Sequence, residues 1–343
     1  MVVPKFCIVK YIEKIATFRP SPTMTRINWF MEIREASEND IPEIVKVLKA
    51  SLGEDQIELS EKVWRYKHID NPFGNSIVLI AIEDEKIIGV RAFMRWEWQY
   101  ESNKYSALRA VDTATHPQHQ GKGIFKKLTL KAVDLAKLNN DNFIFNTPND
   151  QSRPGYLKMG WKQVGKIYVG LKPSLSFLKP KKSQQAYSIE KNISQTEIEV
   201  LCTDWNKMLE AKSGLFTPKS AEMLKWRYEE NPLQSYEVIA GKGYYLAAYI
   251  KKRGRFKEFR IAEYIYDRNL LDKKELKKII KKIISKFSCH LISFSPSLLD
   301  LNAKKGNLGP MLTFNALNMS EEENEFSLKI SSWNNSLGDL ELF

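Results

Sequence analysis

The sequence predicts a mixed α/β (α+β) fold made of two tandem domains, each with a mixed, mostly antiparallel central sheet flanked by helices. The chain has 343 residues, more than one typical domain holds. Apolar and polar residues alternate along Val90–Tyr100 with the period of a half-exposed strand. A motif of the first half recurs in the second: Trp64-Arg65-Tyr66 with Asn71-Pro72, then Trp226-Arg227-Tyr228 with Asn231-Pro232. We interpret the recurrence as a duplicated unit.

The composition is that of a globular protein without a disulfide framework. Hydrophobic residues make up 43% and aromatic residues 11% of the chain, which is enough to form sizeable cores. The cysteines Cys7, Cys202 and Cys289 are scattered and have no metal-binding spacing. We therefore expect no metal site and a reducing, cytoplasmic location. No apolar run approaches the roughly 20 residues that cross a bilayer, so we expect no membrane span.

The chain is strongly basic, with 53 Lys and Arg against 41 Asp and Glu and a net charge of +12. Such a charge favours anionic partners, namely nucleic acid, an acidic membrane surface or phosphate-bearing ligands. Lysines that only keep the protein in solution account for the charge equally well. The charge alone therefore does not predict a nucleic-acid partner.

Residues 1–30 form a basic extension ahead of Met31, which we expect to be a disordered tail or to result from a start placed too far upstream. The first domain is expected at 31–170. Its strands are predicted at Met31–Arg34, Ser76–Ile82, Val90–Tyr100, Lys104–Thr115 and Phe143–Asn146. Its helices are predicted from Asp40, from Ser60, from about Gly123 and over Ser152–Met159. The helix from about Gly123 has an apolar face formed by Ile124, Leu128, Ala132, Leu135 and Ala136.

Residues 171–186 are expected to be a linker, because Pro173, Pro180 and a lysine run interrupt any regular period. The second domain is expected at 187–343. Its order of elements resembles that of the first domain, because strand patterns at Tyr236–Ala240 and Tyr244–Ile250 follow the recurring motif. Its helix at Asp272–Phe287 has a stripe of leucine and isoleucine opposite a row of lysines. That row is either a solvated face or a surface for a phosphate-bearing ligand.

A glycine motif follows the strand Lys104–Thr115. Pro117 stops the strand, and the next helix begins at about Gly121 to Gly123. The first amides of a helix lack intrahelical acceptors and lie at the positive end of the helix dipole. Glycine lets a ligand approach the backbone, and Lys122 and Lys126 add positive charge. The pattern predicts a site for a phosphate or pyrophosphate.

At this point the chain resembles the GNAT superfamily of acyl-CoA-dependent N-acyltransferases. The family's phosphate motif, Gln/Arg-x-x-Gly-x-Gly/Ala, maps onto Gln120-Gly121-Lys122-Gly123-Ile124-Phe125, with Phe125 in place of a small residue. The family's downstream pattern, Asn-x-x-Ala/Ser…Tyr-x-x-x-Gly-Phe, maps onto Asn149, Ser152, Tyr156, Gly160 and Trp161. The resemblance covers residues 31–170 and implies a catalytic domain there. The second domain has no counterpart of the glycine motif, so we expect a degenerate GNAT-like unit.

The resemblance implies roles for these residues toward acetyl-CoA as the acyl donor. Backbone groups of Thr113 and Thr115 would bond pantetheine and the acyl carbonyl. Asn149 would bond the pantetheine arm, and Tyr156 would return a proton to the departing thiolate. A phenol suits this role because its pKa of about 10 is close to that of a thiol. The pyrophosphate would be held by the amides of Gly121, Lys122, Gly123, Ile124 and Phe125. The alternative for Tyr156 is a packing role under the sheet.

The acceptor amine must also lose a proton, and two carboxylates are candidate bases. Asp112 lies on the strand that leads into the glycine motif, and Glu97 lies on the polar face of the neighbouring strand. Asp112 could equally be a hydrogen-bonded residue at a strand end, and Glu97 an ordinary solvated charge. A chain of water molecules would make either base unnecessary.

We expect an N-acetyltransferase that acts on a primary amine of a small molecule, such as an amino sugar or an envelope precursor. One alternative keeps the fold but uses aminoacyl-tRNA or a longer acyl-CoA as the donor. Another is a non-catalytic acyl-CoA-binding module, which Phe125 suggests. Binding of acetyl-CoA and release of its thiol against a panel of amines separate the three.

Overall fold

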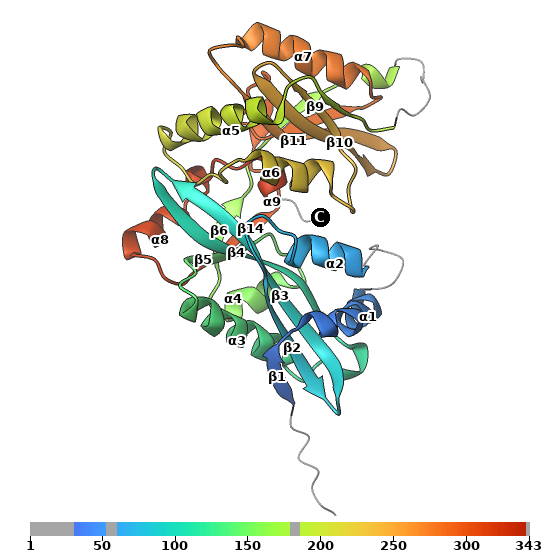
Figure 1. Ribbon diagram of the computed structural model, residues 1–343, viewed down its shortest axis with the longest axis vertical. Helices are drawn as coiled ribbons and strands as arrows, with labels where there is room; N and C mark the ends of the chain where they lie inside the picture. Colours follow the sequence, from blue (N-terminus) through green and yellow to red (C-terminus); the bar gives the residue numbers. More distant parts are fainter. Residues whose placement is uncertain (1–30, 53–59, 179–185, 341–343) are drawn as a thin grey trace, which may run out of the picture. The chain divides into compact units, whose positions relative to one another are not determined.

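The computed structural model describes residues 31–52, 60–178 and 186–340, so the predicted extension at 1–30 lies outside it. Residues Met31–Phe343 form one compact unit that contains two seven-stranded sheets (Figure 1). Helices flank both sheets, which confirms the predicted α/β class and agrees with a tandem arrangement. Within the described ranges, no helix is long and apolar enough to cross a membrane.

The first sheet has the strand order β1-β2-β3-β4-β5-β14-β6. In that order its strands are Glu32–Glu35, Ile77–Glu83, Lys86–Tyr100, Asn103–Thr115, Phe143–Asn146, Met311–Ala316 and Lys162–Lys166. All neighbours are antiparallel except β4 and β5, which are parallel. The five strands predicted for the first domain all lie in this sheet.

The second sheet has the order β8-β9-β10-β11-β12-β7-β13. In that order its strands are Ile189–Lys191, Glu237–Gly241, Tyr244–Arg253, Phe256–Tyr266, Leu291–Phe294, Val169–Pro173 and Lys304–Gly306. The parallel pairs are β8 with β9 and β11 with β12. The second sheet therefore repeats the order of the first, and its fourth and fifth strands are again parallel.

Each sheet contains one strand from the other half of the chain. β14 lies between β5 and β6 in the first sheet, and β7 lies between β12 and β13 in the second. β7 follows β6 directly in the sequence, so it crosses over to a sheet formed otherwise by later residues. The predicted linker at 171–186 thus begins inside a strand, and its part at 179–185 lies outside the described residues. No local sequence pattern indicated the strand β7, because it is defined by its antiparallel pairing with β12, which is far away in the sequence.

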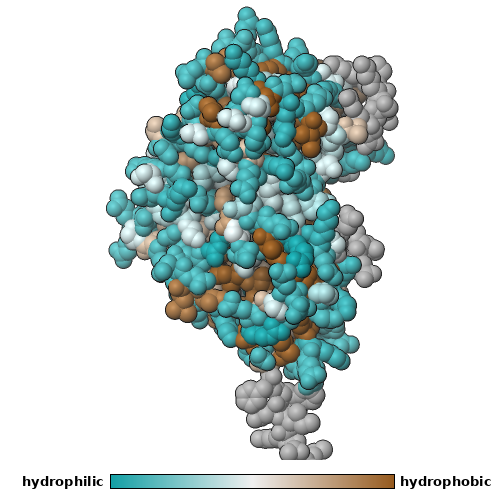
Figure 2. All heavy atoms as spheres, viewed as in Figure 1, coloured by the Kyte–Doolittle hydropathy of each residue, from teal (hydrophilic) through white to brown (hydrophobic). Residues whose placement is uncertain are grey.

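Helices cover both faces of the first sheet. α1 (Ile41–Leu52) and α2 (Glu61–His68) pack on one face, and α3 (Ile124–Leu138) and α4 (Arg153–Lys158) lie at the other (Figure 1). The predicted apolar face of α3 is buried, as Ile124, Leu128 and Ala132 show. Figure 2 shows a mostly hydrophilic surface, with apolar residues gathered over α3 and α4.

The remaining helices belong to the second half and to its connections. They are α5 (Gln195–Glu210), α6 (Ala221–Leu224), α7 (Lys273–Ser285), α8 (Glu321–Ser327), α9 (Leu337–Leu340) and the helical turn η4 (Lys225–Glu229). Short turns of helix also occur at Glu38–Asp40, Pro117–His119, Ser176–Leu178 and Ile330–Ser332. In α7 the predicted apolar stripe is buried against the second sheet, including Leu276, Ile280 and Ile283.

The two copies of the recurring motif contact each other. Tyr66 Oη donates a hydrogen bond to the Trp226 carbonyl at 2.7 Å, and Trp226 Nε1 donates one to the Tyr66 carbonyl at 2.9 Å. Their rings are stacked, with centroids 5.1 Å apart. Asn71 and Asn231 make equivalent turns, in which each Oδ1 accepts from the amide two residues later. The two copies of the recurring motif therefore form equivalent local structures.

Candidate functional site

A bulge in β4 opens the first sheet beside the predicted glycine motif. The register between β3 and β4 skips Asp112, whose φ is 38°. Left-handed backbone is uncommon outside glycine, but aspartate adopts it more readily than most residues. β4 pairs with β5 only as far as Arg109. From Ala110 to Thr115, β4 therefore has one edge that pairs with no other described strand, which leaves backbone groups for a chain-like ligand.

The glycine motif forms the turn into α3, as predicted. Gly121 and Gly123 have φ values of 79° and 74°, a region that glycine adopts without strain. A Cβ added at either position would meet no atom within 4 Å, so the space beside the turn is open. The first turn of α3 has no acidic residue, and the exposed Lys122 has its Nζ 3.4 Å from Glu83. Open space, outward amides and a first helical turn without an acidic residue suit a phosphate.

The corresponding helix of the second half begins differently. Asp272 caps α7, and its Oδ1 accepts from the amides of Lys274 and Glu275, each at 2.7 Å. These bonds lower the pKa of the Asp272 carboxyl, so it is charged at neutral pH. The carboxylate occupies the end of the helix that α3 leaves open. A phosphate approaching α7 would be repelled.

Phe125, which departs from the family motif, packs toward α4. Its ring meets the Tyr156 ring edge-on, with centroids 5.7 Å apart. A Cβ added at Gly155 would lie 3.3 Å from Phe125 Cε1, so glycine at that position makes room for the ring. The large side chain thus fills space between α3 and α4, and the amide of Phe125 stays in the first turn of α3.

Asn149 and Ser152 form the turn into α4. Asn149 Oδ1 accepts from the amide of Ser152 at 2.9 Å and from its hydroxyl at 2.8 Å. Asn149 is exposed and Ser152 is half-buried. At the other side of the site, Gln120 Nε2 donates to the Thr115 carbonyl at 3.4 Å. Only the Gln120 contact reaches β4, and the binding roles of Gln120, Asn149 and Ser152 remain predictions.

Tyr156 lies on α4 and is 5% exposed. Arg91 Nη1 donates a hydrogen bond to Tyr156 Oη at 2.8 Å and another to Thr113 Oγ1. Arg91 is fully buried, and its guanidinium carbon lies 4.6, 5.3 and 5.7 Å from the ring centroids of Phe93, Tyr156 and Phe125. No acceptor among the described residues bonds its Nε or Nη2. Arg91 thus joins two predicted site residues, Thr113 and Tyr156.

Asp112 is held by two basic side chains from α2. Asp112 Oδ2 lies 2.8 Å from His68 Nε2 and forms an ion pair with Lys67. Burial raises the pKa of the Asp112 carboxyl, but the charge of Lys67 and the hydrogen bond from His68 outweigh it and hold that pKa well below its usual range. Such a carboxylate accepts a proton poorly. The geometry favours a role for Asp112 in fixing the bulge over a role as general base.

Glu97 is not brought to the site. It lies on β3 six residues beyond Arg91, which corresponds to about 20 Å along a strand. Its Oε1 forms an ion pair with Lys104 at 3.1 Å, and both side chains are partly or largely exposed. This is the arrangement of an ordinary surface charge.

Sequence reasoning missed Arg91, Lys67 and His68. In the sequence, Arg91 is one of the polar residues that alternate along the strand. Only its contact with Tyr156 of α4 shows that it lies at the candidate site. Lys67 and His68 lie between the two parts of the recurring motif, but their partner Asp112 is far away in the sequence. Among the described residues, no group of three His, Cys, Asp or Glu side chains could hold a metal ion.

A comparison with known proteins finds a family model that matches the part of the chain holding this geometry. A family model described as "Acetyltransferase (GNAT) domain" matches residues 32–164. The match includes the β4 bulge, the glycine turn and α4, and it ends before β7. The degenerate second unit therefore stays a prediction. No curated protein matches the sequence.

Solved structures agree in fold with most of the chain. A "Probable N-Acyltransferase" from Enterococcus faecalis V583 is 13% identical, with a TM-score of 0.62, over 84% of this chain and 73% of that one. A GCN5-related N-acetyltransferase from Anabaena variabilis is also 13% identical, with a TM-score of 0.58 and the same coverage. Eis1 from Mycobacterium abscessus is 10% identical, with a TM-score of 0.50, over 88% and 76%. At these identities the likeness shows the fold alone.

Proposed function

We propose that the protein is an acyltransferase, because a GNAT acetyltransferase domain model matches residues 32–164, and that it transfers an acetyl group from acetyl-CoA to a primary amine of a small molecule in the cytoplasm. The proposed acceptor is an amino sugar or an envelope precursor. The observation that carries the proposal is the open glycine turn at α3, next to the unpaired edge of β4.

The residues present fit acetyl-CoA. The amides from Gly121 to Phe125 would hold the pyrophosphate, because they lie at the positive end of α3 with no side chain in front of the two glycines. The backbone of Thr113 and Thr115 would bond the pantetheine arm, with Asn149 on the opposite side. Once bound, acetyl-CoA supplies an activated thioester.

Tyr156 would give a proton to the leaving sulfur. Its Oη accepts a hydrogen bond from Arg91, so its own hydrogen is available for another acceptor. The guanidinium also stabilises the negative charge that Oη carries after it gives up the proton. The acceptor amine would lose its proton to water, because Asp112 is engaged by Lys67 and His68 and Glu97 is remote.

Calorimetry with acetyl-CoA, followed by thiol release with a panel of amines, tests the proposal. We expect saturable binding and thiol release that depends on the amine. Tyr156→Phe should lower kcat by about a hundredfold and leave the Kd for acetyl-CoA nearly unchanged. Equal loss of both would indicate a packing role for Tyr156. Absence of acetyl-CoA binding would overturn the proposal, and binding without turnover on any amine would favour a non-catalytic module.

A further inference from the structure

Apolar side chains protrude together at one end of the second sheet. Leu175 and Leu178 flank Phe177 in the chain and are 71% and 69% exposed, and Phe256, at the start of β11, is 66% exposed. Phe177 stacks on the ring of His290 with centroids 4.6 Å apart, and Phe256 lies 5.3 Å from the same ring. Single exposed leucines are ordinary, but a group of apolar side chains on a surface marks a place of interaction.

Buried serines fix this apolar segment to the sheet. Ser176 Oγ accepts a hydrogen bond from the amide of Cys289 at 2.9 Å and donates one to the carbonyl of Cys289 at 3.1 Å. The amide of Ser174 donates to the carbonyl of His290 at 2.9 Å. Both serines are buried and the leucines between and after them are exposed, which is the reverse of the usual surface pattern. The fold therefore presents the apolar side chains outward on a fixed support.

Basic side chains border the apolar ones. Lys252 pairs directly with Lys257 across β10 and β11, and Arg255 lies in the turn between these strands. Like charges directly opposite each other destabilise a sheet, so folding alone does not favour this pair. None of the three side chains forms an ion pair with another described residue. The amide of Lys257 donates to His290 Nδ1 at 3.1 Å, which places the cations beside the ring that both phenylalanines contact.

The three segments that build this end of the sheet contain no Asp or Glu. They are residues 171–178, 252–257 and 286–291. Within them, Lys286 pairs with Glu190 and Glu237, each at 3.0 Å, so its charge is already compensated. The charge beside the apolar side chains is therefore carried by the hairpin of β10 and β11.

α7 extends the basic surface at the same end. β12 starts opposite Glu258, near the start of β11, so α7, which leads from the end of β11 to β12, finishes at this end of the sheet. Its exposed lysines are Lys274, Lys277, Lys278, Lys281 and Lys282. The last two belong to the final turns of the helix and lie closest in the chain to His290.

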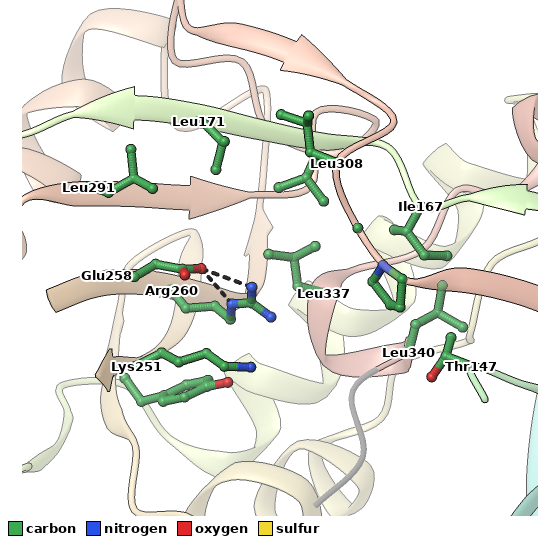
Figure 3. Close-up of a pocket in the computed structure, with 14 residues that line it drawn as sticks. Thr147, Ile167, Leu171, Lys251, Glu258, Arg260, Leu291, Leu308, Leu337 and Leu340 are labelled. Atoms are coloured by element: carbon green, nitrogen blue, oxygen red, sulfur yellow. Dashed lines mark hydrogen bonds and ion pairs between the residues drawn. The ribbon is translucent and has the colours of Figure 1, made fainter. Parts of the chain in front are cut away.

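A pocket of about 620 Å³ borders the apolar side chains (Figure 3). Its lining includes Leu291, which directly follows His290, and Leu171, which precedes Leu175 by four residues. Leu308, which is 53% exposed, lies on the same side of the pocket as these two leucines (Figure 3). The apolar surface at this end of the sheet is therefore larger than the protruding side chains alone.

We propose that this end of the second sheet docks on the surface of a membrane that contains anionic lipids. The docking patch consists of the apolar Leu175, Phe177, Leu178 and Phe256 and the basic Lys252, Arg255 and Lys257. The apolar side chains enter the boundary between head groups and acyl chains, and the cations lie at the level of the lipid phosphates. The proposal does not depend on acyl transfer or on the glycine turn.

Two other partners fit the docking patch less well. Nucleic acid binds to cations and stacked aromatic rings, so the highly exposed Leu175 and Leu178 would gain nothing from it. A second copy in a twofold interface would place the cations of the patch against the same cations of the other copy. Like charges that face each other across an interface cost free energy. An anionic lipid surface uses both the leucines and the cations.

Binding to vesicles tests the proposal. The full-length protein is mixed with vesicles of phosphatidylcholine alone or of phosphatidylcholine with phosphatidylglycerol, and the bound fraction is measured by sedimentation. We expect binding at least about tenfold tighter to the anionic vesicles, because several basic side chains contribute near the surface. Added salt should weaken this binding. Equal affinity for the two kinds of vesicle would overturn the proposal.

A matched pair of leucine variants tests the apolar part of the docking patch. Leu175→Ser should weaken binding to the anionic vesicles by about tenfold, because one apolar side chain no longer leaves water. Leu138→Ser changes a leucine at the end of α3 that is 79% exposed, and should have little effect. Equal effects of the two changes would overturn the proposal.

A second pair separates the docking patch from the net charge of +12, which attracts any anionic surface. Lys252→Gln combined with Arg255→Gln should weaken binding to the anionic vesicles by about tenfold or more. Lys137→Gln combined with Lys207→Gln changes two exposed lysines of α3 and α5, leaves the same net charge and should have little effect. Equal losses in the two double variants would show attraction by net charge alone and contradict the proposal.

The other partners are outcomes of the same experiments. Tighter binding to duplex DNA than to the anionic vesicles, or self-association that Leu175→Ser abolishes in gel filtration, would overturn the proposal. Every changed residue is exposed, so each variant should keep its affinity for acetyl-CoA. Failure of the wild-type protein to bind acetyl-CoA would overturn the proposed function and leave binding to vesicles unchanged, so the two proposals fail separately.

Discussion

Arg91 brings a positive charge into the interior of the first half, where no described carboxylate pairs with it. Three aromatic rings surround its guanidinium, and one of its nitrogens bonds both Thr113 and Tyr156. A buried cation without a counter-charge costs free energy. Its hydrogen bond to Tyr156 is stronger than one from a neutral donor. The arrangement therefore raises the local cost of folding and fixes the position of Tyr156 Oη.

Replacing Arg91 tests whether it acts through Tyr156. Arg91→Met should lower kcat by about tenfold, with little change in the Kd for acetyl-CoA, because the phenolate loses a charged donor. Arg91→Lys should restore part of the rate. In the background of Tyr156→Phe, Arg91→Met should have little further effect on kcat. Equal effects in both backgrounds would show that Arg91 acts independently of Tyr156.

His68 makes stability depend on pH. Burial lowers the pKa of its imidazole below 6.5, against the opposing effect of Asp112. A group whose pKa is depressed by folding contributes stability above its unfolded pKa and loses it as the pH falls. The free energy of unfolding should therefore decrease below about pH 6.5. Urea titrations should show a shallower decrease for His68→Gln than for His116→Gln, which changes the histidine that caps the helical turn Pro117–His119. Parallel curves for the two variants would contradict this.

The starts of α3 and α7 are two versions of one element. Gly123 leaves the end of α3 open, and the carboxylate of Asp272 closes the end of α7. The difference in charge at one position decides whether the helix can receive a phosphate.

Transferring the cap of α7 to α3 should remove the site. Gly123→Asp should weaken acetyl-CoA binding by about tenfold or more, because its carboxylate competes for the amides and repels phosphate. Gly123→Asn has nearly the same shape, tolerates the same backbone and carries no charge, so it is the matched control. Calorimetry compares the two. Similar losses of affinity would mean that size, and not charge, matters at this position.

Elements with a strong local pattern could be predicted from the sequence. The apolar face of α3 and the glycine turn depend on residues close together in the chain, and each lies where it was predicted. The alternation along β3 correctly indicated a strand, but the strand is not half-exposed: helices cover both faces of the sheet, and Arg91 and Phe93 are fully buried. The site contacts could not be predicted in the same way. Arg91 meets Tyr156, and Lys67 meets Asp112, only because the sheet and its helices bring distant segments together. The exchange of β7 and β14 escaped prediction for the same reason.

At the scale of the whole molecule, a buried ion cluster ties the C-terminal segment to the second half. Lys219 Nζ lies 2.8 Å from Glu263 of β11 and 2.6 Å from Asp339 of α9, and all three side chains are almost fully buried. Burial lowers the pKa of Lys219, but the charges of Asp339 and Glu263 outweigh it and raise that pKa. Lys219 therefore stays charged across the neutral range, whereas burial raises the pKa of the Glu263 carboxyl.

Lys219→Met should destabilise the protein by about 3–5 kcal/mol, because it leaves two buried carboxylates without a cation. Lys225→Met removes a lysine of an exposed ion pair with Glu230 and should change the free energy of unfolding little. Urea denaturation of both variants measures the difference. A loss as small as that of Lys225→Met would show that the cluster contributes specificity and not stability.

The exchange of strands also constrains how the chain matures during its synthesis. Small domains commonly fold in order as they leave the ribosome, the N-terminal one first. Here β5 and β6 are made early, but the strand between them, β14, ends at Ala316. The first sheet therefore lacks the strand between β5 and β6 until nearly all of the second half has been synthesised. β7 is synthesised before every other strand of the sheet to which it belongs. The second sheet needs residues up to Gly306 and the first sheet needs β14 up to Ala316, so almost the whole chain must leave the ribosome before either sheet is complete.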